Sequence, residues 1–526
     1  MTDVIDSLTH VDNLVIGAGA AGGQIAMQLA EAGQQVLILE AGPARSVNDL
    51  VSSQIWARRL KWSGAEVIET GNHTISHTFN AGYGTGGSAA HHYGVWLRLH
   101  EADFRVRSDH DISLDWPIQY QDLQPWYDRV QQQMTLSGDL EQEIWRPAGA
   151  PYPNPPLPIF AQGRVLERAF KSSGLRTSPL PLAINSVPRG ERAACLYDGW
   201  CDAGCPIGAL ANPLVTTLPR AQRAGAQIVH DATVLRVLRD PNKPERITGV
   251  EYMLNGERRR LSAGRVIVAA FAVQSTRILL NSAVDSSPAP GNRYDQLGRY
   301  LCTHPAGTAF GLFEDETLPH QGVSGGQLLC HDLYDNKAPF EGAFGSHQWL
   351  IANAVKPHDL LSYSTSRADI IGDALAPWLK QAARHLANMT LVCEDISVAD
   401  NRISLSERRD EYGAPLAQAH HDAHPKSAAL WQQAIANGLK ILTTGGAIET
   451  WNGPRAAMHI LGGTIMGDDE RQSVTDSFGR VHDTDNLYVT GTSVFPTTGA
   501  VNPTFTLSAL AARTADHLGA PLNNPG

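Results

Sequence analysis

The pattern of hydrophobic and polar residues near the start of the chain predicts a strand, a turn, a helix and a second strand. The short apolar run Asn13–Ile16 is followed by six small residues, Gly17-Ala18-Gly19-Ala20-Ala21-Gly22. A helical stretch over 24–32 comes next, and a second apolar run over 36–39 ends at Glu40. Short apolar runs bounded by turn residues are typical of buried strands, and their alternation with a helix indicates an α/β domain.

Later parts of the chain have patterns of their own. The segment 227–270 predicts a β-meander followed by an amphipathic helix, with strands at 227–229, 233–237, 248–253 and 265–270 and the helix over 273–282. Residues 306–450 show weaker alternation and mixed polarity, which indicates a separate antiparallel domain with helices. Near the C-terminus we expect a strand at 487–489 and a helix over 504–518. Two segments have the glycines, prolines and polar residues of loops and connections, 41–85 and 143–160.

Composition and charge restrict the classes of protein that fit. The 526 residues are 42% hydrophobic and 18% charged, which suits about two to four globular domains with large cores. The net charge of −11 argues against nucleic-acid binding, because phosphate binding needs a basic surface. The longest apolar runs, such as Val266–Val273, fall short of the roughly 20 residues of a membrane-spanning helix. The segment 1–17 lacks the features of an export signal, so we expect a cytoplasmic protein unless a partner carries it across a membrane.

The glycine-rich turn has the features of a dinucleotide-binding site. Gly17, Gly19 and Gly22 form a G-x-G-x-x-G motif between a strand and a helix, and Glu40 follows 23 residues after Gly17. In such a turn the first glycine permits the bend, the second lets the backbone approach a pyrophosphate, and the third lets the helix pack against the strand. The helix N-terminus then faces the anion, and Glu40 can accept a hydrogen bond from a ribose hydroxyl. The motif alone does not separate FAD from NAD.

Three of the six cysteines lie close together in the sequence. Cys195, Cys201 and Cys205 fall within eleven residues, and the other three are scattered. A reducing compartment keeps thiols free, so this grouping favours a metal or redox role over disulfides. Three thiolates suit a [3Fe–4S] cluster, whereas a [4Fe–4S] cluster usually needs a fourth cysteine. The spacing also leaves a zinc site or thiols without a role open.

A second group of possible metal ligands comes before Pro425. It consists of His420, His421, Asp422 and His424. Its polar surroundings favour a solvated face over a metal site, and we expect these side chains at the surface.

Several segments, spread over nearly the whole chain in a consistent order, resemble the glucose–methanol–choline (GMC) oxidoreductase family. They are Gly17–Gly22 with EAGP (40–43), GTGGS (84–88), VIVAAFAVQSTRILLNSA (266–283), LGRYLCTHP (297–305), HILGGTIMG (459–467) and NLYVTGTSVFPTTGAVNPTFTLSALAAR (486–513). Two more, DWPIQYQDLQPWY (115–127) and CPIGA (205–209), are similar to the large subunits of bacterial FAD-dependent glucose, fructose, sorbitol and gluconate dehydrogenases and to glucoside 3-dehydrogenases.

The resemblance implies FAD as the cofactor and a catalytic pair near the C-terminus. In the family a histidine and a partner histidine or asparagine face the flavin, and the matching residues here are His459 and Asn502. Oxidation of an alcohol needs a base for the hydroxyl proton, and histidine titrates near the working pH. We therefore expect His459 to be the base and Asn502 to orient the substrate oxygen.

The resemblance also implies further contacts with the flavin. We expect them from the loop at 84–88 and from a C-terminal segment, at Gly86, Gly87, Ser88, Gly491, Thr492, Pro503 and Thr504. Thr492 stands where the family usually has an acidic residue. His91 matches a histidine that some members bond covalently to the flavin, and a buried histidine beside the cofactor is the alternative.

The fold that the resemblance implies is α/β, with a Rossmann-like FAD-binding domain and a substrate-binding domain built on an antiparallel sheet with helices. We expect the FAD domain at 1–110, 211–305 and 456–526, the substrate or cap domain at 111–190 and 306–455, and a cluster loop at 191–210. The related dehydrogenases carry a [3Fe–4S] cluster at cysteines matching Cys195, Cys201 and Cys205.

The same relatives act with partners. Their electrons leave through the cluster to a cytochrome c or another carrier, and a small subunit carries the export signal. This implies a place on the periplasmic side of the inner membrane, with the cytoplasm as the alternative. An oxidase that uses oxygen directly, or an FAD-containing lyase or non-redox homologue, remains a rival. The sugar or polyol substrate is not specified, because its pocket is expected in the divergent region 306–455.

Overall fold

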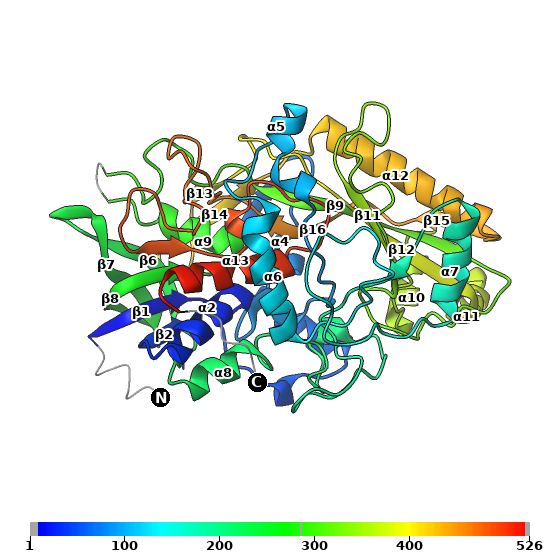
Figure 1. Cartoon of the computed structure of the whole chain (residues 1–526), viewed down its shortest axis with the longest axis horizontal. Helices are drawn as coiled ribbons and strands as arrows, with labels where there is room; N and C mark the ends of the chain where they lie inside the picture. The colour runs from blue at the N-terminus through cyan, green and yellow to red at the C-terminus, as the bar shows by residue number, and fades with distance from the viewer. Residues whose placement is uncertain (1–8, 285–286, 521–526) are drawn as a thin grey trace.

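The framework of the protein is two large β-sheets and one small sheet, seen side by side in Figure 1. This computed structural model describes residues 9–284 and 287–520. Residues 1–8, part of the segment considered for an export signal, and 521–526, the end of the expected FAD domain, lie outside the described residues.

The first sheet has the strand order β5-β2-β1-β8-β7-β6, with β17 also paired to β8. Its strands are β1 (His10–Ile16), β2 (Val36–Leu39), β5 (Gln227–Val229), β6 (Thr233–Asp240), β7 (Lys243–Leu254), β8 (Glu257–Val268) and β17 (Leu487–Val489). The expected strands at 36–39 and 487–489 are confirmed. The core pairings β2–β1–β8 and β17–β8 are parallel, as in a dinucleotide-binding domain.

The expected meander over 227–270 is wrong at its first strand. β5 pairs in parallel with β2, and the antiparallel meander consists of β6, β7 and β8. The physical reason is that β8 is long: its first half pairs with β7, and its second half enters the parallel sheet beside β1. The helix expected at 273–282 is α9 (Phe271–Leu280), which follows β8 directly.

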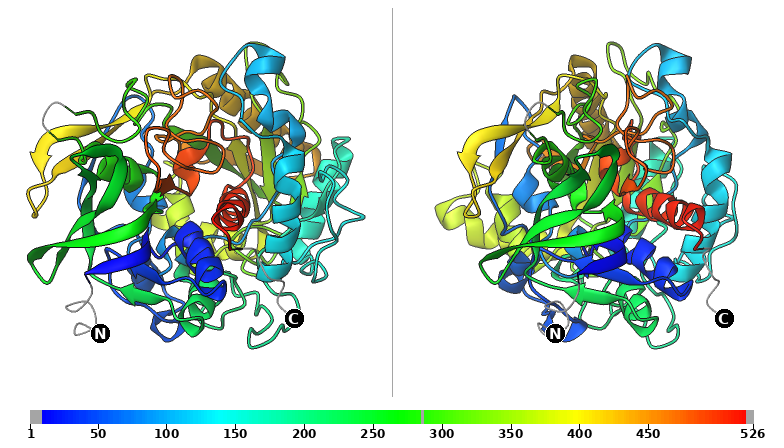
Figure 2. Two further views of the ribbon diagram at one scale, coloured as in Figure 1. Left: turned by 60° about the vertical axis from the view of Figure 1, so that its left-hand side comes forward. Right: turned by 90° about the vertical axis from the view of Figure 1, so that its left-hand side faces the viewer.

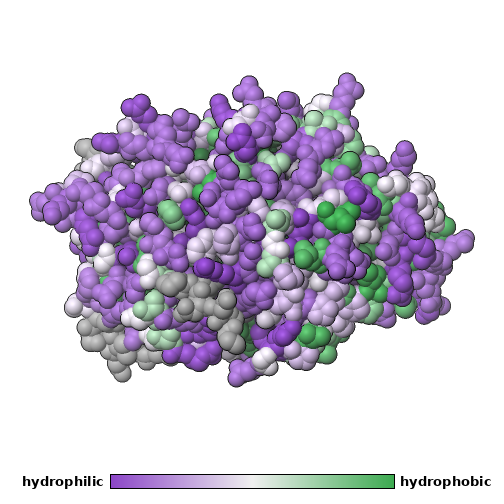
Figure 3. All heavy atoms as spheres, in the orientation of Figure 1, coloured by the Kyte–Doolittle hydropathy of each residue, from purple (hydrophilic) through white to green (hydrophobic). Residues whose placement is uncertain are grey.

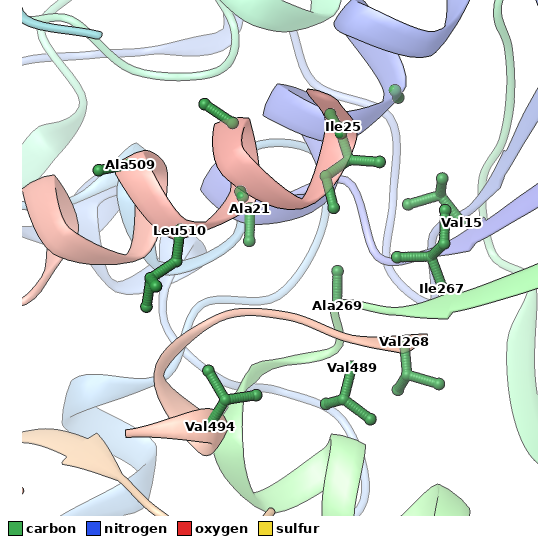
Figure 4. Packing of buried hydrophobic residues seen from close by; sticks show 14 of the residues in the cluster. Val15, Ala21, Ile25, Ile267, Val268, Ala269, Val489, Val494, Ala509 and Leu510 are labelled. Atoms are coloured by element: carbon green, nitrogen blue, oxygen red, sulfur yellow. The ribbon is translucent and has the colours of Figure 1, made fainter. Parts of the chain in front are cut away.

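Two helices with small residues cover the first sheet. α2 (Ala20–Glu31) begins inside the glycine turn, four residues earlier than expected, and α13 (Thr504–His517) packs between α2 and α6 (Tyr120–Met134) (Figure 2). Figure 4 shows how Ala21 and Ile25 of α2 lie near Ala509 of α13 and above Ile267 of β8. Alanine side chains allow this close approach of helices to each other and to the sheet.

The second sheet is antiparallel and has the order β15-β9-β12-β11-β10-β4, with β16 also paired to β9. Its strands are β4 (Ser178–Pro179), β9 (Cys302–Leu312), β10 (Leu328–Cys330), β11 (His347–Ile351), β12 (Leu386–Cys393), β15 (Glu449–Asn452) and β16 (Ala456–Leu461). The structure confirms that the region expected from residue 306 onward is built on an antiparallel sheet. Its outer face packs on α7 (Ala161–Ser172) and α12 (Pro425–Thr444), at the right of Figure 1.

A third sheet of three strands lies beside the first and contains a strand that the sequence pattern did not predict. It has the order β13-β14-β3, with β13 at Arg402–Arg409, β14 at Pro415–His420 and β3 at Val67–Thr70. β3 falls in the segment 41–85, which was expected to be loop. It is four residues long and pairs with a strand about 350 positions away, so its local pattern is too short to recognise.

The group before α12 corrects a second expectation. His420 and Asp422 are partly exposed, as expected for a solvated face, but His421 is 0% exposed. Its Nε2 lies 2.8 Å from a carboxylate oxygen of Asp395, and its Nδ1 lies 2.6 Å from the carbonyl oxygen of His73. Side chains alternate between the two faces at the end of β14, so His421 turns inward where His420 turns outward.

The face of the molecule shown in Figure 3 is mostly hydrophilic, in keeping with the charged surface of a globular protein. In the part of the chain that the structure describes, none of the helices combines the length and the apolar character needed to span a membrane.

Candidate active site

A cleft of about 770 Å³ lies between the glycine turn of the first sheet and one face of the second sheet. Most residues expected at the site line it: Gly17, Gly19, Glu40, Gly87, Ser88, His91, His459, Gly491, Thr492, Asn502, Pro503 and Thr504. Gly22 and Gly86 lie behind the wall of the cleft instead. The cleft therefore brings together segments from both ends of the chain.

The three glycines of the turn have different surroundings. Gly17 has a φ of +105°, and a Cβ there would lie 2.6 Å from the carbonyl oxygen of Ala269. A Cβ at Gly22 would lie 2.0 Å from the carbonyl oxygen of Gly17, so only glycine lets α2 approach the strand this closely. No described protein atom lies within 4 Å of a Cβ built at Gly19, which faces the cleft.

Open space therefore lies in front of the N-terminus of α2. Gly19 is the N-cap of this helix and gives it no side-chain hydrogen bond. The first amides of the helix remain available to an anion, and the helix dipole favours a negative charge at this place. This arrangement suits the pyrophosphate of a dinucleotide.

Glu40 closes the turn from the other side and is 7% exposed. One carboxylate oxygen accepts a hydrogen bond from the amide of Ala18 at 2.8 Å, and the other accepts from the amide of Gly42 at 2.9 Å. A carboxylate oxygen has two lone pairs, so each can accept another hydrogen bond from a hydroxyl in the cleft.

The loop at 84–88 packs against the glycine turn. The amide of Gly86 donates to the carbonyl oxygen of Ala18 at 3.0 Å, and Gly86 has a φ of +95°. Gly86 thus holds the loop in place, while Gly87 and Ser88 reach the cleft.

His91 lies at the end of this loop and is buried. Its Nδ1 is 3.0 Å from the ammonium nitrogen of Lys61, and its Nε2 has no hydrogen-bond partner among the described residues. Burial, and then the charge of Lys61, hold the pKa of His91 well below its usual value of 6.5. Burial also lowers the pKa of Lys61 to about 8. His91 lines the cleft, so its imidazole can pack against a bound ring.

His459 and Asn502 meet at the far end of the cleft. The Nδ2 of Asn502 is 3.3 Å from the Nε2 of His459. Burial, and then the neighbouring ring of His304, hold the pKa of His459 well below 6.5. The ring is therefore neutral at physiological pH and can accept a proton.

An irregular strand positions His459. The pairing of β16 with β9 shifts register between Met458 and Leu461, and His459 within this bulge has a φ of +62°. The hydroxyl of Thr303 donates to the carbonyl oxygen of His459 at 2.8 Å, and the amide of His459 donates to Asn80 at 3.2 Å. Bulges of this kind change the direction of a side chain next to a functional site.

Two residues that support this pair were not singled out from the sequence. The Nδ1 of His304 is 2.9 Å from the Nδ1 of His459, and the Nε2 of Gln348 donates to the Oδ1 of Asn502 at 3.3 Å. His304 was part of the family-like segment 297–305, but no local feature marked it as a partner of a residue 155 positions away.

The C-terminal segments expected to face a flavin also border the cleft. Gly491 has a φ of +109°, and the hydroxyl of Thr492 donates to the carbonyl oxygen of Ile460 at 2.7 Å. Pro503 is the N-cap of α13, whose first turn carries no acidic residue. The amides at the start of α13 therefore provide a second positive helix end in the cleft.

These features together fit FAD. The cleft is large, it offers an open glycine turn and the N-termini of α2 and α13, and His91 lies in its wall. A Cβ at Gly19 would occupy part of the open space that a pyrophosphate needs.

The second sheet supplies the opposite wall. Thr308, Thr390 and Leu350 lie in one row across β9, β12 and β11, and all three line the cleft. The hydroxyl of Thr390 donates to the Oδ1 of Asn353 at 3.0 Å. This wall is rich in hydroxyl and amide groups that can bind the hydroxyls of a substrate.

Charged groups at the edge of this wall are paired. The ammonium group of Lys356 lies 3.5 Å from Asp202 and 3.3 Å from Asp359, and all three line the cleft. One cation between two carboxylates leaves no unpaired positive charge here to attract an anionic substrate.

The three cysteines expected to bind a cluster are close to each other and free of disulfides. The amide of Tyr197 donates to the sulfur of Cys195 at 3.3 Å, and the amide of Leu210 donates to the sulfur of Cys205 at 3.4 Å. Burial raises the pKa of the Cys201 thiol to about 12, and the nearby thiols of the group add to this effect. Hydrogen bonds from backbone amides to sulfur are also found around the thiolate ligands of iron–sulfur clusters.

Among the described residues, the side chains of this loop do not form a site for a single metal ion. Across residues 9–284 and 287–520, no group of three or more His, Cys, Asp or Glu side chains is placed to hold one metal ion. A cluster contains several iron atoms and spreads its ligands farther apart than one zinc ion does.

Comparison with known proteins gives matches over most of the chain. Models of a family described as GMC oxidoreductase match residues 11–306 and 397–511. The chain is 28% identical to 2-methyl-1,2-propanediol dehydrogenase of Mycolicibacterium austroafricanum over 97% of this chain and 96% of that protein. It is 26% identical to the fructose dehydrogenase large subunit of Gluconobacter japonicus over 96% of this chain and 97% of that protein.

A solved structure has a similar fold. Pyridoxine 4-oxidase from Mesorbium loti superposes with a TM-score of 0.66 at 17% identity, covering 97% of this chain and 99% of that one.

Proposed function

The chain belongs to the GMC oxidoreductase family, and from this premise we propose that it is an FAD-dependent dehydrogenase that oxidises a hydroxyl group of a sugar, glycoside or polyol. The observation that carries the proposal is the pairing of His459 with Asn502 in the same cleft as the glycine turn at Gly17–Gly22. A base and an amide donor then face one substrate oxygen, as alcohol oxidation requires.

His459 and Asn502 have different roles in this reaction. The Nε2 of His459 accepts the proton of the substrate hydroxyl, and the Nδ2 of Asn502 donates a hydrogen bond to the substrate oxygen. Bound in the cleft, FAD supplies the two-electron acceptor for the hydride that leaves the carbon. The buried walls exclude water from the reacting groups.

The wall of the cleft that the second sheet supplies supports an uncharged, hydroxyl-rich substrate. Thr308, Thr390 and Asn353 present hydroxyl and amide groups, and Lys356 is neutralised by two carboxylates. The names of the relatives include a diol dehydrogenase and a sugar dehydrogenase subunit, which agrees with this substrate class.

We further propose that Cys195, Cys201 and Cys205 bind a [3Fe–4S] cluster. Asp202 follows Cys201 and lines the cleft, so the cysteine loop borders the cofactor site on one side. On the other side, Leu196 is 69% exposed and Ile207 is 37% exposed. A relay in this position receives electrons one at a time and passes them to a carrier at the surface.

The partners follow from this arrangement. The carrier is a cytochrome c or another one-electron acceptor on a partner, and one relative is named as the large subunit of a dehydrogenase. A small subunit with an export signal would place the enzyme on the periplasmic side of the inner membrane, and the cytoplasm is the alternative.

Anaerobic titration of the holoenzyme tests the main proposal. Monosaccharides, glycosides and polyols are added in turn, and the flavin absorbance is followed. We expect a member of this panel to bleach the flavin. In His459→Gln we expect the flavin reduction rate to be at least about 100-fold lower with unchanged flavin content. Hydrogen peroxide formed at turnover in air would identify an oxidase instead, and an unbleached flavin across the panel would contradict the proposal.

A cysteine variant tests the cluster separately. Iron and acid-labile sulfide are measured in the wild type and in Cys201→Ser, with Cys330→Ser as a control because Cys330 lies on β10 outside the cysteine loop. We expect Cys201→Ser to lose iron and the reduction of cytochrome c while substrate still bleaches its flavin. Wild-type protein without iron would rule the cluster out.

A further inference from the structure

A second histidine, His304, touches the proposed base and has no role in the account so far. It is 0% exposed on β9, and its Nδ1 is 2.9 Å from the Nδ1 of His459. The two rings are perpendicular, with their centroids 5.0 Å apart. We propose that His304 is a positioning residue that holds His459 in the tautomer protonated on Nδ1 and so leaves Nε2 free to accept the substrate proton. This inference rests on the proposed function, which makes His459 the base.

The hydrogen bonds of His304 define its own tautomer. Its Nε2 lies 3.0 Å from the carbonyl oxygen of Gly499 and 3.3 Å from that of Thr498. Carbonyl oxygens only accept hydrogen bonds, so the hydrogen of a neutral His304 is on Nε2. Burial lowers the pKa of His304 to about 4, against the opposite effect of these carbonyls, so the ring is neutral at pH 7. Its Nδ1 therefore carries a lone pair.

That lone pair decides which nitrogen of His459 carries hydrogen. Two bare nitrogens 2.9 Å apart would repel each other, so the Nδ1 of His459 must donate to the Nδ1 of His304. A neutral imidazole has a single N–H group, and the Nε2 of His459 is then the bare nitrogen. This is the nitrogen beside Asn502 at the cleft.

The orientation of Asn502 leads to the same tautomer by a separate route. The Nε2 of Gln348 donates to the carbonyl oxygen of Ala500 at 2.7 Å, which fixes which end of its amide is the donor. That donor also meets the Oδ1 of Asn502, so the Nδ2 of Asn502 is the end that faces His459 at 3.3 Å. An amide nitrogen donates, and it requires a lone pair on the Nε2 of His459.

The charged groups near His304 do not disturb this arrangement. Asp395 and Asp103 both favour its protonated form, but each carboxylate is also bound to another side chain. Asp395 is 2.8 Å from His421, and Asp103 is 2.6 Å from the ammonium group of Lys337. Around His459, the titratable group that shifts its pKa is His304 itself.

Two substitutions separate positioning from packing. In His304→Asn, the Oδ1 can occupy the place of the imidazole Nδ1 and still accept a hydrogen bond from His459. In His304→Leu, a side chain of similar bulk offers no acceptor. His347→Asn is the control, because His347 is a buried histidine on β11 of the same sheet and does not line the cleft.

The first readout does not depend on activity. Nitrogen-15 NMR of the histidine-labelled holoenzyme, assigned with His459→Gln, shows which ring nitrogen of His459 carries hydrogen. We expect a protonated Nδ1 and a bare Nε2 in the wild type and in His304→Asn, and a mixture of tautomers in His304→Leu. A bare Nδ1 in the wild type, or no change in His304→Leu, would overturn the proposal.

The second readout is the rate of anaerobic flavin reduction. We expect His304→Leu to lower it about 10- to 100-fold with a substrate Kd within about threefold, and His304→Asn to keep most of the rate. Equal losses in both variants, in proportion to their lower Tm, would mean that His304 acts only through packing. If no substrate bleaches the wild-type flavin, the proposed function fails while the NMR result still decides the tautomer.

Discussion

At the scale of single residues, burial determines how His459 behaves as a base. His459 is half-buried, and its pKa lies well below 6.5 because burial leaves the charged ring poorly solvated. A neutral base is then present over the whole physiological range. The lower pKa makes His459 a weaker base. The fixed orientation of the ring offsets this, because Asn502 and His304 hold both of its nitrogens in place.

The substitution Asn502→Asp tests this dependence on surroundings. A carboxylate about 3.3 Å from the Nε2 of His459 stabilises the imidazolium and raises its pKa. In the wild type the flavin reduction rate should be nearly constant down to pH 6, because the base remains neutral. In Asn502→Asp the rate should begin to fall at a higher pH than in the wild type, and stopped-flow reduction between pH 5 and pH 9 measures the shift. An unchanged pH profile would contradict the assignment of His459 as the base.

The ion pair between His421 and Asp395 makes a second residue-scale prediction, about stability. Burial disfavours the charged imidazole, but the charge and hydrogen bond of Asp395 outweigh it and raise the pKa of His421 above 6.5. The folded state therefore binds this proton more tightly than the unfolded state does. The resulting stability is fully present below about pH 6.5 and is lost as the pH rises through the folded-state pKa.

Asp395→Asn should remove this dependence. We expect the free energy of unfolding to fall by about 3 kcal/mol at pH 6, and by less at pH 9, because the contribution of the proton on His421 decreases as the pH rises. Denaturant melts at the two pH values measure both differences. A loss that is the same at pH 6 and pH 9 would show that His421 is not charged in the folded protein.

At the scale of elements, the glycine turn combines a packing requirement with a binding requirement. Gly22 lets α2 cross close to β1, and Gly19 leaves space at the helix N-terminus. The two glycines belong to one motif, yet an added methyl group would meet protein at one and the open cleft at the other.

Alanine substitutions should therefore separate these roles. In Gly22→Ala the Cβ meets the backbone of Gly17 at 2.0 Å. We therefore expect a loss of about 2–4 kcal/mol in unfolding free energy and a loss of bound FAD. In Gly19→Ala the unfolding free energy of the apoprotein should lie within about 1 kcal/mol of the wild-type value, while FAD affinity falls at least about tenfold. Thermal melts of apoprotein and flavin titrations measure the two effects. Full FAD affinity in Gly19→Ala would place the pyrophosphate elsewhere.

Elements with a strong local pattern could be predicted from the sequence, and those defined by distant partners could not. The strands at 36–39 and 487–489 and the helix from Thr504 were visible in short apolar or helical runs. The partner of β5 depends on which strand edge the folded sheet leaves open, and no local pattern reports that. In the site, His459 and Asn502 stood in family-like segments, but the link from His304 to His459 exists only once β9 pairs with β16.

At the scale of the whole molecule, a buried group of three charges connects the segment before α6 to the second sheet. The ammonium group of Lys337 lies 2.6 Å from Asp103, which precedes the α6 region, and 2.8 Å from Glu394 at the end of β12. The hydroxyl of Tyr334 donates to Asp103 at 2.9 Å and accepts from the amide of Ala500. The segment that carries Asn502 is thus anchored to the same group of charges through Tyr334.

Removal of the cation should weaken both the fold and the site. In Lys337→Met two carboxylates remain buried without their partner, and we expect a loss of about 3–5 kcal/mol in unfolding free energy by urea denaturation. The exposed pair of Arg105 with Asp109, whose side chains are 55% and 43% exposed, gives the matched control, and Arg105→Met should cost less than about 1 kcal/mol. Because Tyr334 and Asp103 also hold the segment at Ala500, Lys337→Met should slow flavin reduction even at temperatures where the variant is fully folded. A variant with lower stability but the wild-type reduction rate would show that this group of charges stabilises the fold without positioning Asn502.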